Sequence, residues 1–336
     1  MKRERWLLIH LATLMLLTSC EKVFLAKDPS TDPMTQFEHL WKAVDEQYAY
    51  FALKGIDWDS VYTAYRPRIE ETMDEQVLFD VLAGMLHVLR DGHVNLTAPF
   101  DRSRNWDWFL DHPVNFNHTV VYRNYLGKEY RITGPLHHTV IDSVLYVYYA
   151  SFGKTISEAH LDILTERAEG LKGMIIDIRD NGGGSSGNAD RLASMLTDEK
   201  RLYGRSRIKT GPEHDAFSGW SDMHIHPRAG RVFTGQVVVL CNRHSYSTSS
   251  RFALMMQALP HVTLMGDQTG GGGGIPVFGE LPNGWVYRLS ATQTVDPEGN
   301  HIEEGVAVDV QVTLDPADEA AGIDTIIEEA LKRLGE

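Results

Sequence analysis

The chain has 336 residues, a formal net charge of −14 and two cysteines. So acidic a chain is unsuited to binding nucleic acid or anionic lipid by charge, and we expect no nucleic-acid partner. One pair of cysteines cannot build a disulfide framework, so stability must come from a hydrophobic core, which a chain of this length can form.

The first residues have the pattern of an export signal. Residues 2–5 are mostly basic, and residues 6–17 form a largely apolar run that is too short to span a bilayer as an anchor. The run ends in the sequence LTSC at residues 17–20. This ending resembles the lipobox of bacterial lipoproteins, although an ordinary signal peptide followed by a stray cysteine is the alternative.

The lipobox resemblance implies a processed and anchored protein. Residues 1–19 would be removed as a signal peptide, Cys20 would carry the lipid, and residues 20–34 would form a polar tether. We therefore expect a location in the bacterial cell envelope, with attachment to a membrane through the N-terminal lipid.

Residues 35–96 are predicted to form an N-terminal helical domain, because apolar residues recur there at helical spacing. The second helix is expected to end at residues 91–92, with Gly92 as its cap, which places His93 just beyond a helix end. The two apolar stripes consist of Phe37, Leu40, Trp41, Val44, Tyr48 and Phe51, and of Leu78, Val81, Leu82, Met85, Leu86 and Leu89.

Residues 97–142 are predicted to form a small β-rich connector. Residues 120–122 and 130–132 suggest a hairpin, and the histidines at 137 and 138 are expected in a loop.

Residues 143–336 alternate between strand and helix patterns, which predicts βαβ units, a largely parallel sheet and an α/β fold. Asn283-Gly284 predicts a hairpin turn between residues 277 and 289, and an apolar stripe predicts a C-terminal helix. The buried-looking strands are residues 144–149, 174–178, 237–240 and 262–265. The expected helices are one that opens at a capping box at residues 155–158 and runs to about residue 170, one at residues 189–196, and the segment that follows residue 247.

The sequence HSYSTSS at residues 244–250 lies between a predicted strand and a predicted helix. Backbone N–H groups and the helix dipole favour negative charge at such a position, which suits a serine that must become an alkoxide. Ser245, Ser247 and Ser249 alternate, and any of them could instead cap the helix. Cys241 is interpreted as a small core residue, or as a weaker candidate nucleophile.

Two other stretches could complete a site with this serine. Residues 177–184, DIRDNGGG, end a strand in a glycine turn that could offer N–H donors, but the turn lacks the features of a phosphate loop. Residues 91–93, DGH, contain His93, and a single histidine is more often a surface or capping residue than a catalytic one. His224 and His226 have no third ligand in register, so we expect no metal site and no cofactor.

Together these stretches resemble the carboxyl-terminal processing and tricorn-type serine peptidases, over about residues 36–312. The resemblance implies a ClpP/crotonase-like core of βαβ units behind an N-terminal helical domain. It also implies that Ser247 is the nucleophile and that Gly183, Gly184 and Thr248 form the oxyanion hole. The sequence EGVAVD at residues 304–309 is similar to a closing motif of the family.

The resemblance also bears on the general base. The processing-peptidase branch uses a lysine, and Gly272 stands at its place here. The tricorn-type branch uses a histidine from the front of the chain and a glutamate near its end, which implies His93 and Glu303, with Glu304 as the alternative. Gly92 stands where tricorn has a serine.

The family often carries a PDZ domain, but residues 96–144 are too few for one. We therefore expect no PDZ module and no built-in sensor of a substrate C-terminus.

These residues imply a peptidase that hydrolyses peptides or proteins through an acyl-enzyme. Because a free imidazole titrates near ~6.5, activity should rise with pH through that range. Two alternatives remain at this point, a non-catalytic relative that binds peptides or other ligands and a crotonase-type acyl-CoA enzyme. The oligomeric state stays open.

Overall fold

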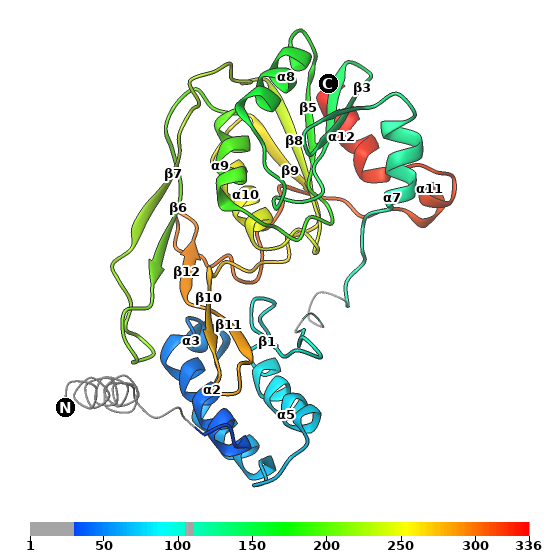
Figure 1. The fold of residues 1–336 in the computed structure, drawn as a ribbon. Helices are drawn as coiled ribbons and strands as arrows, with labels where there is room; N and C mark the ends of the chain where they lie inside the picture. The colour runs from blue at the N-terminus through cyan, green and yellow to red at the C-terminus, as the bar shows by residue number, and fades with distance from the viewer. Residues whose placement is uncertain (1–29, 105, 107–110, 336) are drawn as a thin grey trace, which may run out of the picture.

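The computed structural model describes residues 30–104, 106 and 111–335. The predicted signal peptide, Cys20 and most of the predicted tether lie outside the described residues. The chain forms a helical module at one end and an α/β body at the other, and β-ribbons run between them (Figure 1). Within the described residues, no helix combines the length and apolar character that a membrane span requires.

The helical module is built from the apolar stripes that the sequence predicts. Phe37, Leu40 and Leu82 are fully buried in its core. Asp32, Asp57 and Asp74 cap three of the helices, each accepting a hydrogen bond from a backbone N–H of the first turn. The helical elements are α2 (Pro33–Gln47), α3 (Phe51–Lys54), α4 (Trp58–Tyr65), the 3₁₀ turn η1 (Arg66–Arg68) and α5 (Glu75–His87).

A three-stranded antiparallel sheet completes the helical module. Its strands are β1 (Asn95–Thr97), β11 (Val286–Ser290) and β10 (Pro276–Glu280), in that order. The β10–β11 hairpin pairs Val277 with Leu289, as the Asn283-Gly284 turn predicts. Leu289 packs in the same core as the helices. Residues 276–290 therefore pack with the helical module, although they lie within the segment predicted as the peptidase domain.

The α/β body contains a seven-stranded sheet that confirms the predicted parallel core. Its order is β13-β9-β8-β5-β4-β3-β2 in the described part of the chain. The pairs from β4 to β13 are parallel, and β2, β3 and β4 pair antiparallel. The bounds are β2 (Arg131–Thr133), β3 (Leu136–Ile141), β4 (Val144–Tyr148), β5 (Gly173–Asp177), β8 (Gln236–Cys241), β9 (Val262–Gly266) and β13 (Val310–Gln311).

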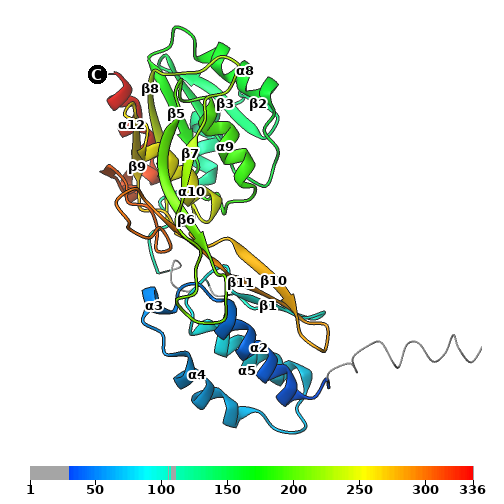
Figure 2. The same ribbon diagram turned by 90° about the vertical axis from the view of Figure 1, so that its left-hand side faces the viewer.

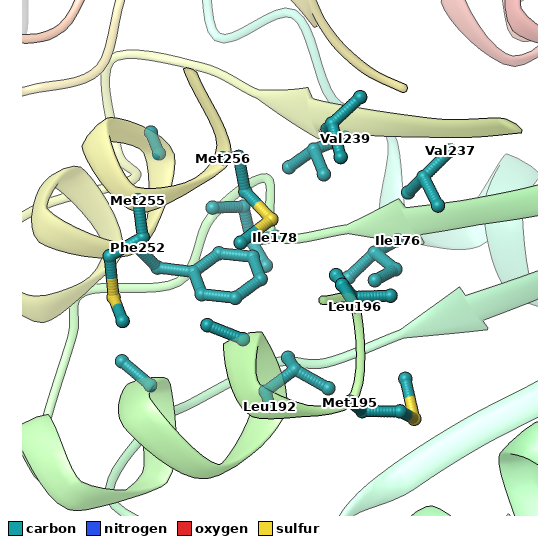
Figure 3. Packing of buried hydrophobic residues seen from close by; sticks show 14 of the residues in the cluster. Ile176, Ile178, Leu192, Met195, Leu196, Val237, Val239, Phe252, Met255 and Met256 are labelled. Atoms are coloured by element: carbon teal, nitrogen blue, oxygen red, sulfur yellow. The ribbon is translucent and has the colours of Figure 1, made fainter. Parts of the chain in front are cut away.

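Helices cover both faces of this sheet, so its central strands are apolar on both sides. Ile176 and Val239 point into one core with α8 (Glu158–Ala168), α9 (Ser186–Ser194) and α10 (Thr248–Gln257). Figure 3 shows Phe252 of α10 between the helices and these strands. Ile175 and Val238 point the other way, toward α12 (Thr325–Gly335). Full burial of side chains of this size contributes about 1.5–3 kcal/mol each.

The predicted connector differs from its expected structure. Residues 118–126 are helical, as α7 (His118–Val120) followed by the π-helix η2 (Val121–Leu126). The side chain of Asn117 accepts a hydrogen bond from the N–H of Val120, and this cap outweighs the β-branched residues that suggested a strand. The hairpin is instead β2–β3, which joins the edge of the main sheet.

The histidine pair of the connector also differs from expectation. His137 and His138 lie in β3 rather than in a loop. His138 is fully buried, and its Nε2 is 2.8 Å from the hydroxyl of Thr133 on the neighbouring strand. The pair is therefore part of the sheet edge.

A second antiparallel ribbon extends from the body toward the helical module (Figure 2). It consists of β6 (Arg201–Ile208), β7 (Ser221–Ile225) and β12 (Thr292–Val295). Residues 286–295 thus pass directly from the module sheet, in β11, into this ribbon, in β12. The remaining helix, α11 (Pro316–Ala320), precedes α12.

Candidate active site

Ser247 lies at the turn between β8 and α10, where it is the N-cap of α10. Its backbone has φ 59° and ψ −116°, a conformation that costs a residue other than glycine about 1–3 kcal/mol. Hydrogen bonds hold the turn, from the Ser247 N–H to the carbonyl of Gly271 (2.8 Å) and from the Arg251 N–H to the carbonyl of Ser247 (3.0 Å). The Ser247 hydroxyl makes no capping hydrogen bond.

The neighbouring serines have structural partners. Ser245 donates to the carbonyl of Ile178 (2.8 Å), and Ser249 donates to the carbonyl of Asn181 (2.7 Å). Both hydroxyls are buried and tie the start of α10 to the glycine turn. Of the three alternating serines, Ser247 is the one whose hydroxyl reaches a histidine.

Cys241 does not join this site. Its thiol is fully buried and donates to the carbonyl of Asp267. Burial, and then the nearby carboxylate of Asp267, raises the pKa of the Cys241 thiol far above its usual range. This environment matches the interpretation as a core residue.

The structure brings His93 to Ser247 from a distance of 154 residues in the sequence. The Nε2 of His93 lies 2.9 Å from the Oγ of Ser247. His93 follows α5 through a turn in which the left-handed residue is Arg90, with φ 44°, rather than the expected Gly92. This turn directs the imidazole from the helical module toward the body.

Tyr246 explains two of the glycines at the site. A Cβ on Gly92 would lie 2.9 Å from the Tyr246 hydroxyl oxygen, so the tyrosine ring fills the space into which a larger residue would project. A Cβ on Gly272 would lie 2.4 Å from the Cζ atom of the same ring, and Gly272 has φ 75°. Position 272 therefore holds no lysine in the sequence, and the Tyr246 ring leaves no space for a lysine side chain there.

The imidazole of His93 is buried, with 2% of the residue exposed. Burial is the main cause that lowers the pKa of His93 to about 4, and the charges of Arg288 and Lys54 act in the same direction, while Asp91 opposes them. The ring is therefore neutral at neutral pH and can accept a proton. This burial corrects the expectation of titration near 6.5.

The resemblance implies a glutamate that orients the histidine base, but the hydrogen bonds of Glu303 go to other groups. One carboxylate oxygen of Glu303 is 2.9 Å from the Nζ of Lys54, and the other accepts the N–H of Gly273 at 2.9 Å. These two donors satisfy the carboxylate. Among the described residues, the Nδ1 of His93 has no hydrogen-bond partner. The alternative, Glu304, is exposed, and its backbone carbonyl accepts from Gln268.

Asp91 is the carboxylate that acts most strongly on His93. Its Oδ1 accepts the backbone N–H of His93 at 2.8 Å, and the side chain is buried. Burial opposes ionisation, but the charges of Lys54 and His93 lower the pKa of Asp91 overall. Asp91 was not among the residues predicted for the site, although its spacing of two residues from His93 in DGH was a signal for this role.

Lys54 is the second residue that the sequence analysis missed. Its side chain is 5% exposed and its ammonium donates both to Glu303 and to the carbonyl of Arg90, each at 2.9 Å. Burial and the charge of Asp91 raise the pKa of Glu303 to about 8, and Lys54 opposes this rise. No sequence pattern distinguishes this lysine from a surface lysine at a helix end.

The predicted oxyanion donors are only partly in place. The N–H of Gly183 donates to the Oδ1 of Asn181 at 3.0 Å, so its predicted role is wrong in this conformation. Thr248 opens α10, and its N–H therefore has no acceptor within the helix. A Cβ on Gly183 would lie 2.9 Å from this nitrogen, which shows that the glycine keeps the Thr248 N–H uncovered. Gly184 packs against Phe152 and accepts the Thr248 hydroxyl.

Two cavities meet at the nucleophile. One has a volume of about 620 Å³ and is lined by His93, Gly183 and Ser247, and the other, of about 310 Å³, is lined by Ser247, Thr248 and Ile275. A chain that lay across Ser247 would occupy both. Among the described residues, no cluster of potential metal ligands is present.

Family models match both parts of the chain. The model described as peptidase family S41 matches residues 143–312, half of the chain, and the model of the tricorn protease C1 domain matches residues 29–87. Among solved structures, a putative peptidase from Parabacteroides merdae is 42% identical, with a TM-score of 0.87 over 91% of this chain and 97% of that chain.

Three further relatives have lower sequence identity to this chain. The photosystem II D1 C-terminal processing protease is 18% identical, with a TM-score of 0.55 over 88% of this chain and 97% of that chain, and it shares the fold. The chloroplastic C-terminal processing peptidase of Tetradesmus obliquus is 28% identical over 51% of this chain. A probable CtpA-like serine protease of Staphylococcus aureus is 23% identical over 46% of this chain. These matches span 35% and 29% of the length of the two curated relatives. The chain belongs to peptidase family S41, a family of serine-type peptidases, and is tricorn-like in its front module.

Proposed function

We propose that this protein hydrolyses peptide bonds through an acyl-enzyme, with Ser247 as the nucleophile and His93 as the general base. The observation that carries the proposal is the 2.9 Å distance between the His93 Nε2 and the Ser247 Oγ. A serine hydroxyl is too weakly acidic to attack an amide unaided, and it needs a base within this distance.

The reaction follows from the positions of the groups. The Nε2 of His93 takes the hydroxyl proton as the Ser247 Oγ attacks the substrate carbonyl carbon, and the carbonyl oxygen becomes negative. The Thr248 N–H and the N-terminal end of α10 stabilise this oxyanion, and a donor of this kind contributes about 3 kcal/mol. The protonated imidazole then gives its proton to the leaving amine, and water hydrolyses the ester by the reverse sequence.

Asp91 and Glu303 serve this reaction differently. The carboxylate of Asp91 stabilises the imidazolium that forms, since its charge favours the protonated ring. Glu303 acts through Lys54, which also holds the carbonyl of Arg90, three residues before the base. We therefore assign Glu303 and Lys54 to positioning the turn that carries His93.

We also propose that the mature protein is exported and held at a membrane by lipid on Cys20. The lipobox-like LTSC sequence at residues 17–20 supports this. Labelling of the protein with a palmitate analogue in a bacterial host, lost in Cys20→Ala, would support lipidation. An unlabelled wild-type protein would contradict it.

A fluorophosphonate probe tests the catalytic proposal, because only an activated serine reacts with it quickly. We expect the wild-type protein to label at Ser247 and to cleave peptides, and Ser247→Ala to lose both while keeping its thermal unfolding transition. Ser221→Ala is the matched control, since Ser221 is exposed on β7. Labelling at another serine would show that Ser247 is not the nucleophile, and no labelling would support a non-catalytic, peptide-binding relative instead.

A further inference from the structure

The larger cavity beside Ser247 is positively charged, in contrast to a chain with a net charge of −14. Arg102, Arg243 and Arg288 line it, and Asp180 is the one acidic residue among the described residues that do. The position of these cations next to the nucleophile suggests that they face a substrate.

Two of the cavity's basic residues are already neutralised within the protein. Arg243 forms an ion pair with Asp267, with Nε 3.1 Å from the carboxylate. The Nδ1 of His244 lies 2.7 Å from the Oδ1 of Asp180. These pairs leave Arg102 and Arg288 as the cations without a carboxylate partner among the described residues.

Arg102 and Arg288 converge on one neutral acceptor. A terminal nitrogen of each guanidinium reaches the Oδ1 of Asn95, at 3.0 Å for Arg102 and 3.5 Å for Arg288. The Nε of Arg288 is buried and has no hydrogen-bond partner in the described part of the chain. Burial is the main cause that lowers the pKa of Arg288, and the charge of Arg102 acts in the same direction, while Tyr246 and Asp91 oppose this shift.

Two like charges that share a neutral oxygen, one of them with an unsatisfied donor, are poorly compensated by the protein. An anion between them would receive charge-assisted hydrogen bonds from both guanidinium groups. The planar donor arrangement of arginine matches a carboxylate best, since it can donate two parallel hydrogen bonds.

We propose that Arg102 and Arg288 form a carboxylate-binding subsite, so that the enzyme prefers peptides with a carboxylate close to the bond that is cut. The carboxylate can be an acidic side chain or the free C-terminus of a short peptide. This inference rests on the proposed function, because it assigns the substrate class of the same site. It also gives the enzyme a way to select its substrates at the site itself.

Matched peptides provide the test. Acetyl-hexaalanine amide is the neutral probe. Replacement of one alanine by Glu adds a side-chain carboxylate, and replacement by Gln at the same position is its neutral control. Acetyl-hexaalanine with a free C-terminus carries a terminal carboxylate instead. The quantity compared is kcat/KM in wild type. The dissociation constant in Ser247→Ala is measured in parallel, so that recognition is tested even if hydrolysis fails.

We expect an anionic probe to be preferred by about tenfold or more, which one charge-assisted hydrogen bond accounts for. Arg288→Gln and Arg102→Gln should each reduce this preference toward one, while Arg231→Gln, at an exposed ion pair with Glu169, should keep it. A preference for the Glu peptide identifies the side chain as the source, and a preference for the free acid identifies the C-terminus.

The subsite would be overturned if neutral and anionic probes had equal kcat/KM values in wild type and equal dissociation constants in Ser247→Ala. A preference for the anionic probe that remained in both arginine variants would also overturn it. Absence of hydrolysis together with carboxylate-selective binding to Ser247→Ala would instead overturn the proposed function and leave the subsite supported.

Discussion

The α/β body and the helical module contribute to the candidate site in different ways. The body fixes Ser247 through its own backbone, because the turn is held by Gly271 and the adjoining serines are tied to the glycine turn. The module supplies His93 from a turn after α5, across the interface between the two parts. The nucleophile is therefore a property of one part, whereas its activation depends on how the two parts fit together.

The interface that sets this fit contains few polar contacts. The backbone carbonyl of Ala49, in the module, accepts a hydrogen bond from the side chain of Gln293 in β12 (2.5 Å). The Lys54–Glu303 ion pair is a buried charged contact between the parts. A change at one of these residues should alter catalysis by moving the base, without altering the nucleophile.

The largest effect should come from removing the base. His93→Ala should lower kcat by about a thousandfold or more, because it removes the imidazole that lies within hydrogen-bond distance of the Ser247 Oγ and takes its proton. The body should remain folded, since its core does not include His93. Steady-state kinetics and thermal unfolding measure the two quantities, and a kcat within tenfold of wild type would show that another group is the base.

The next effect concerns the oxyanion donor in the body. Gly183→Ala should lower kcat by about a hundredfold, because the new Cβ would crowd the Thr248 N–H and because Gly183 has φ 93°. Gly182→Ala is the matched comparison, since no atom lies within 4 Å of its Cβ position. A loss of similar size in both variants would remove the assignment of Thr248 as the donor.

Breaking the buried ion pair should reduce stability and activity together. Above about pH 8, where Glu303 is ionised, Lys54→Met would leave its carboxylate buried without a cation, and loss of one partner of such a pair costs about 3–5 kcal/mol of unfolding free energy. At neutral pH the cost is smaller, because protonation of Glu303 removes the unpaired charge. The double variant Lys54→Met/Glu303→Gln should recover part of this loss.

Urea unfolding measures these values, and Lys42→Met, at an exposed pair with Glu46, should change stability by less than about 1 kcal/mol. If Lys54→Met proves as stable as Lys42→Met, the ion pair does not hold the interface.

The pH dependence should separate a buried base from an exposed one. Because the pKa of His93 is lowered to about 4, kcat/KM should rise with pH around pH 4 and be level from about pH 5 to 8. A rise centred near 6.5 would show that the imidazole is exposed to water in the working enzyme, and that the module has moved away from the body.

The same lowered pKa should appear, as the smallest effect, in the stability profile. Between about pH 6.5 and pH 4 the unfolded chain binds more protons at His93 than the folded chain does. This residue therefore makes the protein less stable as the pH falls through that window. His93→Gln should make the unfolding free energy less dependent on pH there, and an unchanged slope would contradict the burial.

Much of the body could be predicted from the sequence, because its signals are local. Continuous apolar strands, the glycine turn after Asp177 and the serine run before α10 each report on their own segment. The family resemblance then paired His93 with Ser247, which no local pattern could do. The error at residues 118–126 arose because β-branched residues suggested a strand where the Asn117 cap starts a helix.

The partners of the carboxylates could not be predicted in the same way. Glu303 and Lys54 are 249 residues apart, and only the packing of the module on the body brings them together. Gly183 was assigned from its family position, but the side chain of Asn181, two residues away, takes its N–H. Both errors concern which donor reaches an acceptor in three dimensions.

The rate of fluorophosphonate labelling at Ser247, compared between wild type and His93→Ala at pH 7, tests the central claim most directly. Labelling depends on the activated hydroxyl alone, and it needs no knowledge of the natural substrate. The account predicts rapid labelling of Ser247 in wild type and a rate at least about a hundredfold slower in His93→Ala. Equal rates in the two proteins would contradict the claim that the helical module supplies the base.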